Sequence, residues 1–212
     1  MKIDIFSDTV CPWCRIGKRH LELALADWPG EPVTIRHRSF FLDPDIPAEG
    51  YDFQAHMTAK GGGRMTPEDF FAMPRQRGKA VGLTFNFEDI AKAPNTMLSH
   101  RLVYLTPEAE RGAMLDAIFA AYFEFGRDIG DPDVLAAIAA EQGQDAAAIR
   151  AALAGDAAEA QVLADIAFAQ QAGISSVPFF IFNDKYALSG AQPVEVMGRA
   201  LRQVAEKDLS GS

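Results

Sequence analysis

The sequence predicts an α/β fold, because short segments with strand periodicity lie near both ends of the chain and helical periodicity fills the stretch between them. Glycine- and proline-rich turns mark the boundaries. A length of 212 residues fits one domain, or one domain with a large insertion, and a hydrophobic fraction of 49% supplies a sizeable core. We therefore expect two terminal segments that build one sheet, with a helical block inserted between them.

The N-terminal segment predicts a strand–helix–strand unit. Residues 2–6 and 33–40 have strand-like patterns, and residues 12–27 have helical periodicity until Pro29 and Gly30 end it. A helical crossover between two parallel strands of one sheet is right-handed. We therefore expect these two strands to pair in parallel.

The middle of the chain, residues 43–171, predicts an insertion of about five to seven helices. Thr66 is a typical N-cap residue and Pro67 suits a first helical position, and further helices are expected to begin at Asp131 and at Asp145. A glycine-rich break is expected at 60–64, and helices are expected from Pro67, over 95–105, over 108–125, from Asp131 to Gly143, from Asp145 to Gly155 and over 156–171. Because no strand pattern of comparable strength occurs, we expect the insertion to be all-helical.

The C-terminal segment predicts a hairpin followed by a helix. Residues 179–182 are expected to form a buried strand and residues 186–189 a second strand. Asn183 and Asp184 supply the turn between them. The final helix is expected over 193–206.

Cys11 and Cys14 are the only cysteines of the chain, and they lie at the junction between the first strand and the first helix. A Cys-X-X-Cys pair in this position is typical of a thioredoxin-like redox centre. The N-terminus of a helix favours a thiolate on the first sulfur, and a second sulfur one turn later can attack a mixed disulfide. We therefore expect Cys11 to be the exposed, attacking sulfur and Cys14 the buried, resolving sulfur.

Two other roles for the cysteine pair are disfavoured. A structural disulfide across two residues closes a small loop and adds little stability. A zinc site needs about four ligands, and the chain has no second cysteine pair. The histidines are scattered without ligand spacing, at His20, His37, His56 and His100. We expect no metal site and no cofactor-binding residue.

The cysteine pair makes the expected fold more specific: a thioredoxin-like fold with a large all-helical insertion. We expect residues 1–42 and 172–212 to form one discontinuous thioredoxin-like domain, and residues 43–171 to form the insertion domain.

Val177 and Pro178 form the second informative motif, because the proline opens an expected buried strand although it has no N–H to donate. The alternative is an ordinary trans proline at a strand edge, and cis bonds are rare even before proline. The thioredoxin architecture places a cis-proline opposite its cysteine pair. We therefore expect a cis bond here, with Val177 and Pro178 orienting the backbone of a substrate.

Charge and composition restrict the partners. The net charge is −9 and the pI is about 4.9, and no basic block is long enough for a nucleic-acid footprint. Asp4 and Asp8 interrupt the region where a signal peptide needs an apolar stretch, and no run of about 18 apolar residues predicts a membrane helix. We expect a cytoplasmic protein without nucleic-acid or membrane partners, in which a lone cysteine pair is catalytic.

Residues near the pair have competing interpretations. Pro12 and Trp13 lie between the sulfurs, where Trp13 could shield the site and stack on substrate or simply pack on the surface; we favour the site role. Arg15, Lys18 and Arg19 could stabilise a thiolate, but a solvated helix face is the favoured interpretation.

Three residues farther from the pair stay open in role. Asp8 could couple to Cys11 or cap its loop. Asn95 and His100 are expected to be a helix cap and a packed side chain, with substrate or glutathione contacts as the alternative.

These motifs together resemble the DsbA family of thioredoxin-fold proteins, and more narrowly its cytoplasmic FrnE-like branch. The resemblance covers nearly the whole chain. It is carried by the N-terminal strand, Cys11-Pro12-Trp13-Cys14, Asp43-Pro44, Asn95-Thr96, His100-Arg101, Ala121-Tyr122-Phe123, Asp128-Ile129, Val177-Pro178-Phe179-Phe180 and Ser189-Gly190-Ala191-Gln192. It implies a protein disulfide oxidoreductase that performs thiol–disulfide exchange without a metal or a bound organic cofactor.

Two alternatives to thiol–disulfide exchange stay open. The chain also resembles 2-hydroxychromene-2-carboxylate isomerases and kappa-class glutathione transferases in topology, but those enzymes typically carry serine where this chain has Cys11. A non-catalytic binding module that uses the Pro178 groove is the other alternative. Expected partners are a thiol or disulfide substrate protein, or glutathione as a co-substrate, and the acidic surface and insertion could support a homodimer.

Overall fold

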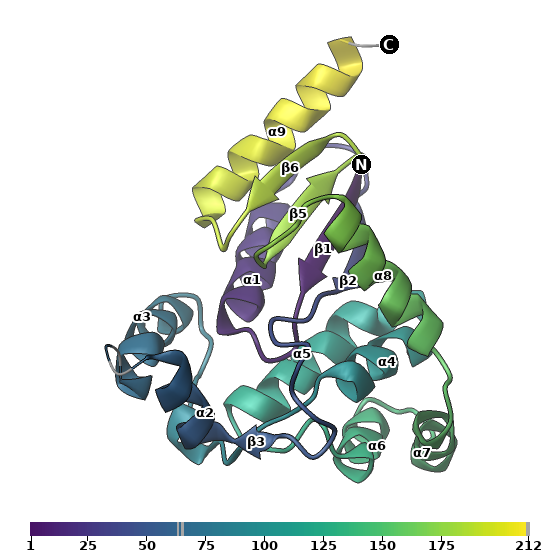
Figure 1. Cartoon of the computed structure of the whole chain (residues 1–212). Coiled ribbons are helices and arrows are strands. Elements are labelled where there is room, and N and C mark those ends of the chain that lie inside the picture. Colours follow the sequence, from purple (N-terminus) through teal and green to yellow (C-terminus); the bar gives the residue numbers. More distant parts are fainter. Residues whose placement is uncertain (63, 65, 211–212) are drawn as a thin grey trace.

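The sheet is built from the two ends of the chain, as the sequence predicts. In the computed structural model, which describes residues 1–62, 64 and 66–210, the strand order is β2-β1-β5-β6. The strands are β1 (Lys2–Ser7), β2 (Thr34–Ser39), β5 (Phe179–Phe182) and β6 (Tyr186–Ser189). β1 pairs with β2 in parallel and with β5 antiparallel, and β5–β6 is the predicted hairpin. Figure 1 shows the N-terminal and C-terminal segments side by side in this sheet.

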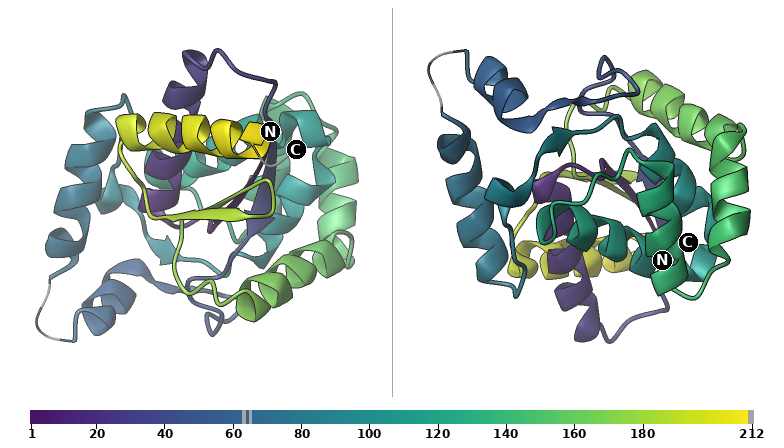
Figure 2. Two further views of the ribbon diagram at one scale, coloured as in Figure 1. Left: turned by 90° about the horizontal axis from the view of Figure 1, so that it is seen from above. Right: turned by 90° about the horizontal axis from the view of Figure 1, so that it is seen from below.

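Helices cover both faces of the sheet. Helices α1 (Pro12–Ala26) and α9 (Val194–Ser210) pack against each other on one face. Ile3 and Ile5 of β1 point to this face and join one apolar cluster with Leu21 of α1. The opposite face carries α8 (Glu159–Gln171), where Phe6 packs with Ala169. Figure 2 shows α9 and α8 on opposite sides of the strands.

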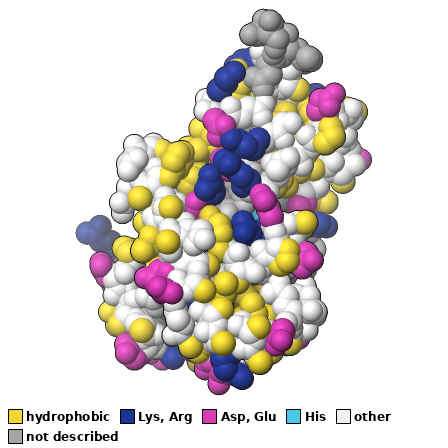
Figure 3. Space-filling model, turned by 90° about the vertical axis from the view of Figure 1, so that its right-hand side faces the viewer, with side chains coloured by type: hydrophobic (Ala, Val, Ile, Leu, Met, Phe, Trp, Pro, Cys, Tyr) yellow, Lys and Arg dark blue, Asp and Glu magenta, His cyan; other side chains and the backbone are white. Residues whose placement is uncertain are grey.

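Charged side chains also lie on the face beneath α8. Asp4 accepts hydrogen bonds from Arg36, with both oxygen–nitrogen distances at 2.5 Å, and Arg38 donates to Asp165 of α8 at 2.7 Å. Figure 3 shows Lys and Arg side chains gathered in the upper middle of one face, beside acidic ones. The pair of Arg38 with Asp165 attaches α8 to the sheet in addition to its apolar contacts, while the pair of Arg36 with Asp4 joins β2 to β1.

The insertion is helical except for one short pair of strands. Its helices are α2 (Phe53–Lys60), α3 (Pro67–Lys79), α4 (Met97–Leu105), α5 (Arg111–Phe123), α6 (Pro132–Glu141) and α7 (Ala146–Ala154), with 3₁₀ turns η1 (Phe87–Asp89) and η2 (Glu108–Glu110). Thr66 is the N-cap of α3, as predicted, and the expected helix starts at Asp131 and Asp145 are the N-caps of α6 and α7. Of the expected break at 60–64, residue 63 lies outside the described residues, while Gly61 and Gly62 form a turn.

The prediction of an all-helical insertion is wrong at β3 (Tyr51–Asp52) and β4 (Lys92–Ala93). These strands pair antiparallel, with Tyr51 opposite Ala93. Each strand has only two residues, too few for an alternating pattern to be visible in the sequence.

The predicted boundary between the two domains stays a prediction. α8 lies within the range assigned to the insertion, yet it packs against β2 of the sheet. No described helix is long and apolar enough to cross a membrane.

Candidate active site

Cys11 is the residue at which the loop after β1 becomes α1. Its backbone N–H donates to the carbonyl oxygen of Asp8 at 3.0 Å, and its sulfur accepts a hydrogen bond from the backbone N–H of Cys14 at 3.2 Å. Cys11 is therefore the N-cap of α1, with Pro12 at the first helical position and no acidic residue in the first turn. The partial positive charge of this helix end stabilises negative charge on the sulfur.

Cys14 is buried one turn into α1, with 1% of its surface exposed. Burial raises the pKa of its thiol well above the usual value, and the neighbouring Cys11 sulfur raises it further through a hydrogen bond and its charge. Both cysteines are free thiols. Cys14 is thus held protonated beside Cys11, as a resolving thiol needs to be before a mixed disulfide forms.

The predicted exposure of Cys11 is wrong. Only 3% of its surface is exposed, because the insertion covers the start of α1. Cys11 lies instead in the wall of a cavity of about 400 Å³, whose lining includes Val10, Phe53 and Val177. A reacting sulfur would meet Cys11 from within this cavity.

Val177 and Pro178 lie opposite the cysteine pair. The peptide bond between them is cis. The Cys11 sulfur is 3.9 Å from the carbonyl oxygen of Val177, and the carbonyl of Pro178 accepts a hydrogen bond from the N–H of Gly190 at 2.8 Å. The chain segments 11–14 and 177–178 therefore meet, although about 160 residues separate them.

Gly17 is a residue of this site that the sequence analysis misses. A Cβ atom at Gly17 would lie 2.7 Å from Cγ of Pro178, too close for a real contact. Glycine therefore allows α1 to approach the Val177–Pro178 segment. The signal in the sequence is a glycine inside a helix, which usually has a packing reason.

Pro12 and Trp13 both line the cavity beside Cys11, as a substrate-contacting role requires. Trp13 also borders a second hollow of about 350 Å³, which His20 and Arg77 help to line. Trp13 therefore lies between two hollows, one of which is also lined by Cys11.

The cysteine loop is attached to α4 by buried polar contacts. Nε2 of His100 is 3.3 Å from Oδ1 of Asp8, and the hydroxyl groups of Thr9 and Ser99 are 2.7 Å apart. The other carboxylate oxygen of Asp8 accepts a hydrogen bond from the N–H of Leu42 at 2.7 Å. Asp8 thus caps its loop, and His100 is packed with its ring against Asp8.

Asn95 has a structural role, as the favoured interpretation holds. Its side-chain oxygen accepts a hydrogen bond from the N–H of Met97 at 2.9 Å, and its amide donates to the carbonyl of Ile46 at 2.7 Å. Asn95 therefore lies just before Thr96, the N-cap of α4, where its side chain binds the first N–H of the helix and fixes the loop at Ile46.

Residues 2–202 match the DSBA-like thioredoxin domain family. The chain belongs to this family. This DSBA-like protein is also similar to a solved Streptomyces coelicolor protein described as a probable DsbA oxidoreductase, with 36% identity and a TM-score of 0.89 over 97% of this chain and 90% of that chain. It therefore has the fold and the Cys-X-X-Cys pair of a DsbA-like thiol–disulfide oxidoreductase.

Two further comparisons are more distant. The uncharacterized protein YwbO of Bacillus subtilis (strain 168) is 26% identical over 222 residues, covering 97% of this chain and 98% of YwbO. The structure of a 2-hydroxychromene-2-carboxylate isomerase is 16% identical, with a TM-score of 0.72 over 100% of both chains. At that identity the likeness shows a shared fold alone.

The favoured interpretation of Arg15 and Lys18 as a solvated helix face is wrong for this DSBA-like protein. Both residues are buried, because the insertion packs on this side of α1. Arg15 donates to the carbonyl oxygen of Thr84 at 2.8 Å and pairs with Glu124, while Lys18 pairs with Glu22 and Asp116. These cations hold the insertion against α1.

Among the described residues, no group of three or more His, Cys, Asp or Glu side chains could hold a metal ion.

Proposed function

We propose that this protein is a thiol–disulfide oxidoreductase that transfers two electrons between its Cys11–Cys14 pair and the disulfide or dithiol of a partner. The observation that carries the proposal is the arrangement of the pair: Cys11 caps α1, 3.9 Å from the Val177 carbonyl, and a buried, protonated Cys14 lies one turn behind it.

When the pair is reduced, the exchange proceeds in two steps. The Cys11 thiolate attacks one sulfur of the partner disulfide, a Cys11–sulfur bond forms, and the other partner sulfur leaves as a thiolate. Cys14 then loses its proton and attacks the Cys11 sulfur, which releases the second partner thiolate and leaves a Cys11–Cys14 disulfide. Val177 and Pro178 would orient the partner beside Cys11.

The finer parts of the proposal rest on sequence motifs. Cys11-Pro12-Trp13-Cys14 together with Ser189-Gly190-Ala191-Gln192 favours the FrnE-like branch of the family. The lone catalytic cysteine pair favours a reducing, cytoplasmic compartment, with glutathione as one source of electrons. A homodimer is part of this proposal and would be tested by sedimentation.

A second candidate is a glutathione-dependent isomerase or transferase acting on a small apolar electrophile. The full-length fold similarity to a 2-hydroxychromene-2-carboxylate isomerase favours keeping it. In that case Cys11 would be incidental to the reaction.

A Cys14→Ser variant separates the two functions. We expect it to accumulate a mixed disulfide at Cys11 when mixed with bis(2-hydroxyethyl) disulfide, detected by mass spectrometry, while the wild type proceeds to the Cys11–Cys14 disulfide. Equilibration of the wild type against glutathione buffers should give a reversible two-electron couple. If Cys14→Ser forms no mixed disulfide and the wild type shows no reversible two-electron couple, the isomerase or transferase function is favoured.

A further inference from the structure

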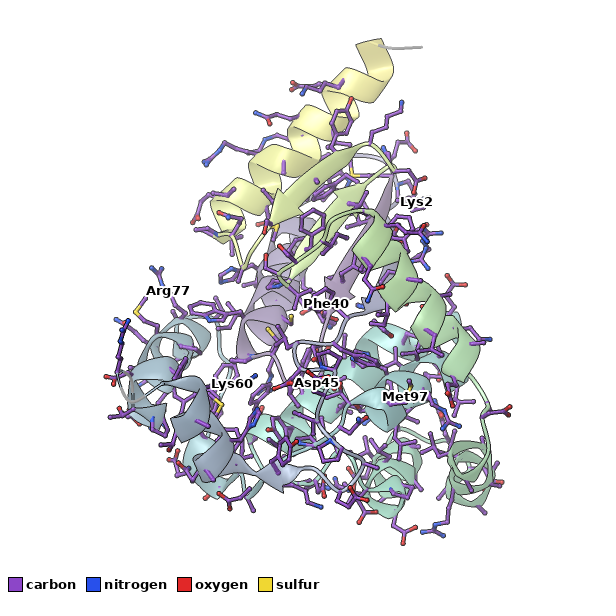
Figure 4. All side chains as sticks on the ribbon, viewed as in Figure 1. Lys2, Phe40, Asp45, Lys60, Arg77 and Met97 are labelled. Carbon is purple, nitrogen blue, oxygen red and sulfur yellow. The ribbon has the colours of Figure 1, made fainter. Side chains whose placement is uncertain are left out.

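The cavity beside Cys11 carries an inference about the substrate class, which rests on the proposed function. It lies between the cysteine loop and the part of the insertion that contains α2, α3 and the end of α5. Its volume of about 400 Å³ is at the low end of the range for small-molecule sites, about 300–1,000 Å³. Figure 4 shows Lys60, at the end of α2, between this helix and the start of α1.

The interior of this cavity is apolar and aromatic. Phe71 stacks on Phe87 with ring centres 4.1 Å apart, and Phe53 stacks on Phe71 at 5.5 Å. Tyr122 presents its ring rather than a free hydroxyl, because its hydroxyl donates to the carbonyl of Lys92 at 3.2 Å. Stacked rings of this kind favour a planar apolar ligand.

The charged residues that line the cavity are already paired with one another. A carboxylate oxygen of Asp43 is 3.1 Å from Nε2 of His56 and 3.0 Å from Nζ of Lys60. The positive charge of Lys60 and the negative charge of Asp43 offset each other, so this group adds no net charge to attract an ionic ligand. An uncharged ligand fits this cavity best.

Access to Cys11 decides the size of the partner. Cys11 is 3% exposed, and its surface contributes to the wall of this cavity. A disulfide in a folded protein has polypeptide on both sides of each sulfur and needs room around the attacking sulfur, whereas a small disulfide can reach a nearly buried sulfur in the wall of a cavity. We propose that the exchange partner of Cys11 is a small, uncharged aryl thiol in its disulfide form, with one ring held among the phenylalanines of the insertion.

The reaction is the exchange already described, with an aryl disulfide as the oxidant. The Cys11 thiolate forms a bond to one aryl sulfur, and the other aryl thiolate leaves. Cys14 then loses its proton, attacks the Cys11 sulfur and releases the second aryl thiolate from the cavity. The products are two aryl thiols and a Cys11–Cys14 disulfide, which a dithiol reductant returns to the reduced state.

The test uses three disulfides and two matched variants of the full chain. The disulfides are 4,4′-dithiodipyridine, bis(2-hydroxyethyl) disulfide and insulin, and each rate is divided by the rate of the same disulfide with free N-acetylcysteine. Met57→Trp places a large side chain in the cavity wall, and Leu163→Trp makes a comparable change on α8, where Leu163 is 47% exposed. Urea unfolding of each variant shows whether it is folded at the assay temperature.

We expect Met57→Trp to lower the normalised rate with 4,4′-dithiodipyridine at least about tenfold, the usual effect of lost space in an apolar pocket. The smaller, flexible bis(2-hydroxyethyl) disulfide should lose much less, Leu163→Trp should change neither rate, and insulin should be the poorest substrate of the wild type. Equal losses for both small disulfides, no loss for either, or insulin as the best substrate would overturn the aryl proposal and leave the exchange function standing. If the reduced protein reacts with none of the three disulfides, the proposed function itself fails.

Discussion

Charged groups are buried both beneath α8 and around the cysteine loop, but the two regions treat them differently. Beneath α8, the Asp165 carboxylate accepts hydrogen bonds from the guanidinium of Arg38 at 2.7 Å, from the backbone N–H of Ser39 at 2.8 Å and from the hydroxyl of Tyr104. Burial and the bond to Asp165 raise the pKa of Tyr104, which keeps this hydroxyl a donor. Each oxygen of Asp165 has a partner whose protonation state does not change at ordinary pH.

Around the cysteine loop, one of the buried polar contacts is long and a thiol lies near it. The contact between Asp8 and His100 is 3.3 Å, longer than the contacts of Asp165 with Arg38 and Ser39, and the nearby Cys14 thiol has a raised pKa. Perturbed groups of this kind are typical of sites where a proton must move, whereas fully paired charges are typical of fixed structure. The difference teaches that paired charges fix the sheet beneath α8, whereas the cysteine loop lies beside a thiol whose proton has to leave during exchange.

The largest expected effect on stability comes from disrupting the ion pair beneath α8. Asp165→Asn keeps the size of the side chain but removes the charge that pairs with Arg38. We expect the free energy of unfolding to fall by about 3 kcal/mol, because the guanidinium loses its buried partner. Urea denaturation measures this loss.

Exchange kinetics provide the control for that variant. The rate of Cys11 with bis(2-hydroxyethyl) disulfide should be unchanged in folded Asp165→Asn protein. A large loss of exchange rate at full stability would show that the network beneath α8 belongs to the active site.

The second expected effect tests the contact between α1 and Pro178. In Gly17→Ala the new Cβ would lie 2.7 Å from Cγ of Pro178, so the Val177–Pro178 segment must move away from Cys11. We expect a loss of about 2 kcal/mol in unfolding free energy and a slower exchange rate.

Gly198→Ala is the matched control within α9. Its Cβ would meet the side chain of Arg202 at an ordinary 3.5 Å, so the substitution should stabilise the protein by about 0.5–1 kcal/mol and leave the exchange rate unchanged. If both alanine variants behave alike, the approach of Gly17 to Pro178 has no role in exchange.

Local signals in the sequence predict much of this fold. The Cys-X-X-Cys spacing, the turn at Asn183–Asp184 and the caps at Thr66 and Asp131 depend only on neighbouring residues, and each lies where the pattern places it. The structure also brings Val177 and Pro178 to Cys11, as the architecture implied by the cysteine pair requires.

The remainder depends on contacts between distant segments, which no local pattern contains. His100 meets Asp8 across 92 residues, and Arg15 is buried because Glu124 and Thr84 come from the insertion. Cys11 is enclosed for the same reason. The packing of the insertion against α1 decides these features, so no local pattern in the sequence identifies Asp8 as the partner of His100.

The third expected effect is a pH dependence from His37, which neighbours Arg36 and Arg38 in β2 but points to the other face. Among the described residues its Nδ1 has no hydrogen-bond partner, and burial, with the charges of Lys18 and Arg111, lowers the pKa of His37 to about 3. Below the unfolded pKa of about 6.5 the unfolded chain therefore binds a proton that the folded protein does not. Stability is lost as the pH falls.

Comparison with His37→Leu isolates this contribution. Between pH 7.5 and 5.5 the wild type should lose about 1 kcal/mol more unfolding free energy than His37→Leu, measured by urea denaturation at both values. If both proteins lose the same unfolding free energy, protonated His37 has a partner in the folded protein. His37 would then not differ from the paired Arg36 and Arg38 of the same strand.

The smallest expected effect concerns the influence of Asp8 on the pKa of the Cys14 thiol. Burial and the Cys11 sulfur raise the pKa of the Cys14 thiol most, a hydrogen bond with the Asp8 backbone lowers it, and the negative charge of the Asp8 side chain raises it by a smaller amount. In a Cys11→Ser background, where Cys14 is the remaining thiol, adding Asp8→Asn should move the pH profile of Cys14 alkylation to lower pH. The comparison is made between the single and double variants with iodoacetamide, under mild urea if the buried thiol reacts too slowly.

A shift of the Cys14 profile to higher pH would reverse the assigned role of Asp8. It would mean that the carboxylate stabilises the thiolate indirectly, through the loop it holds by its bonds to Leu42 and His100. His100→Gln tests that route independently, because it keeps a hydrogen-bonding side chain opposite Asp8 but removes the imidazole. Both substitutions are compared with the Cys11→Ser parent. If the charge of Asp8 acts directly on the thiol, His100→Gln shifts the pH profile of Cys14 alkylation less than Asp8→Asn does.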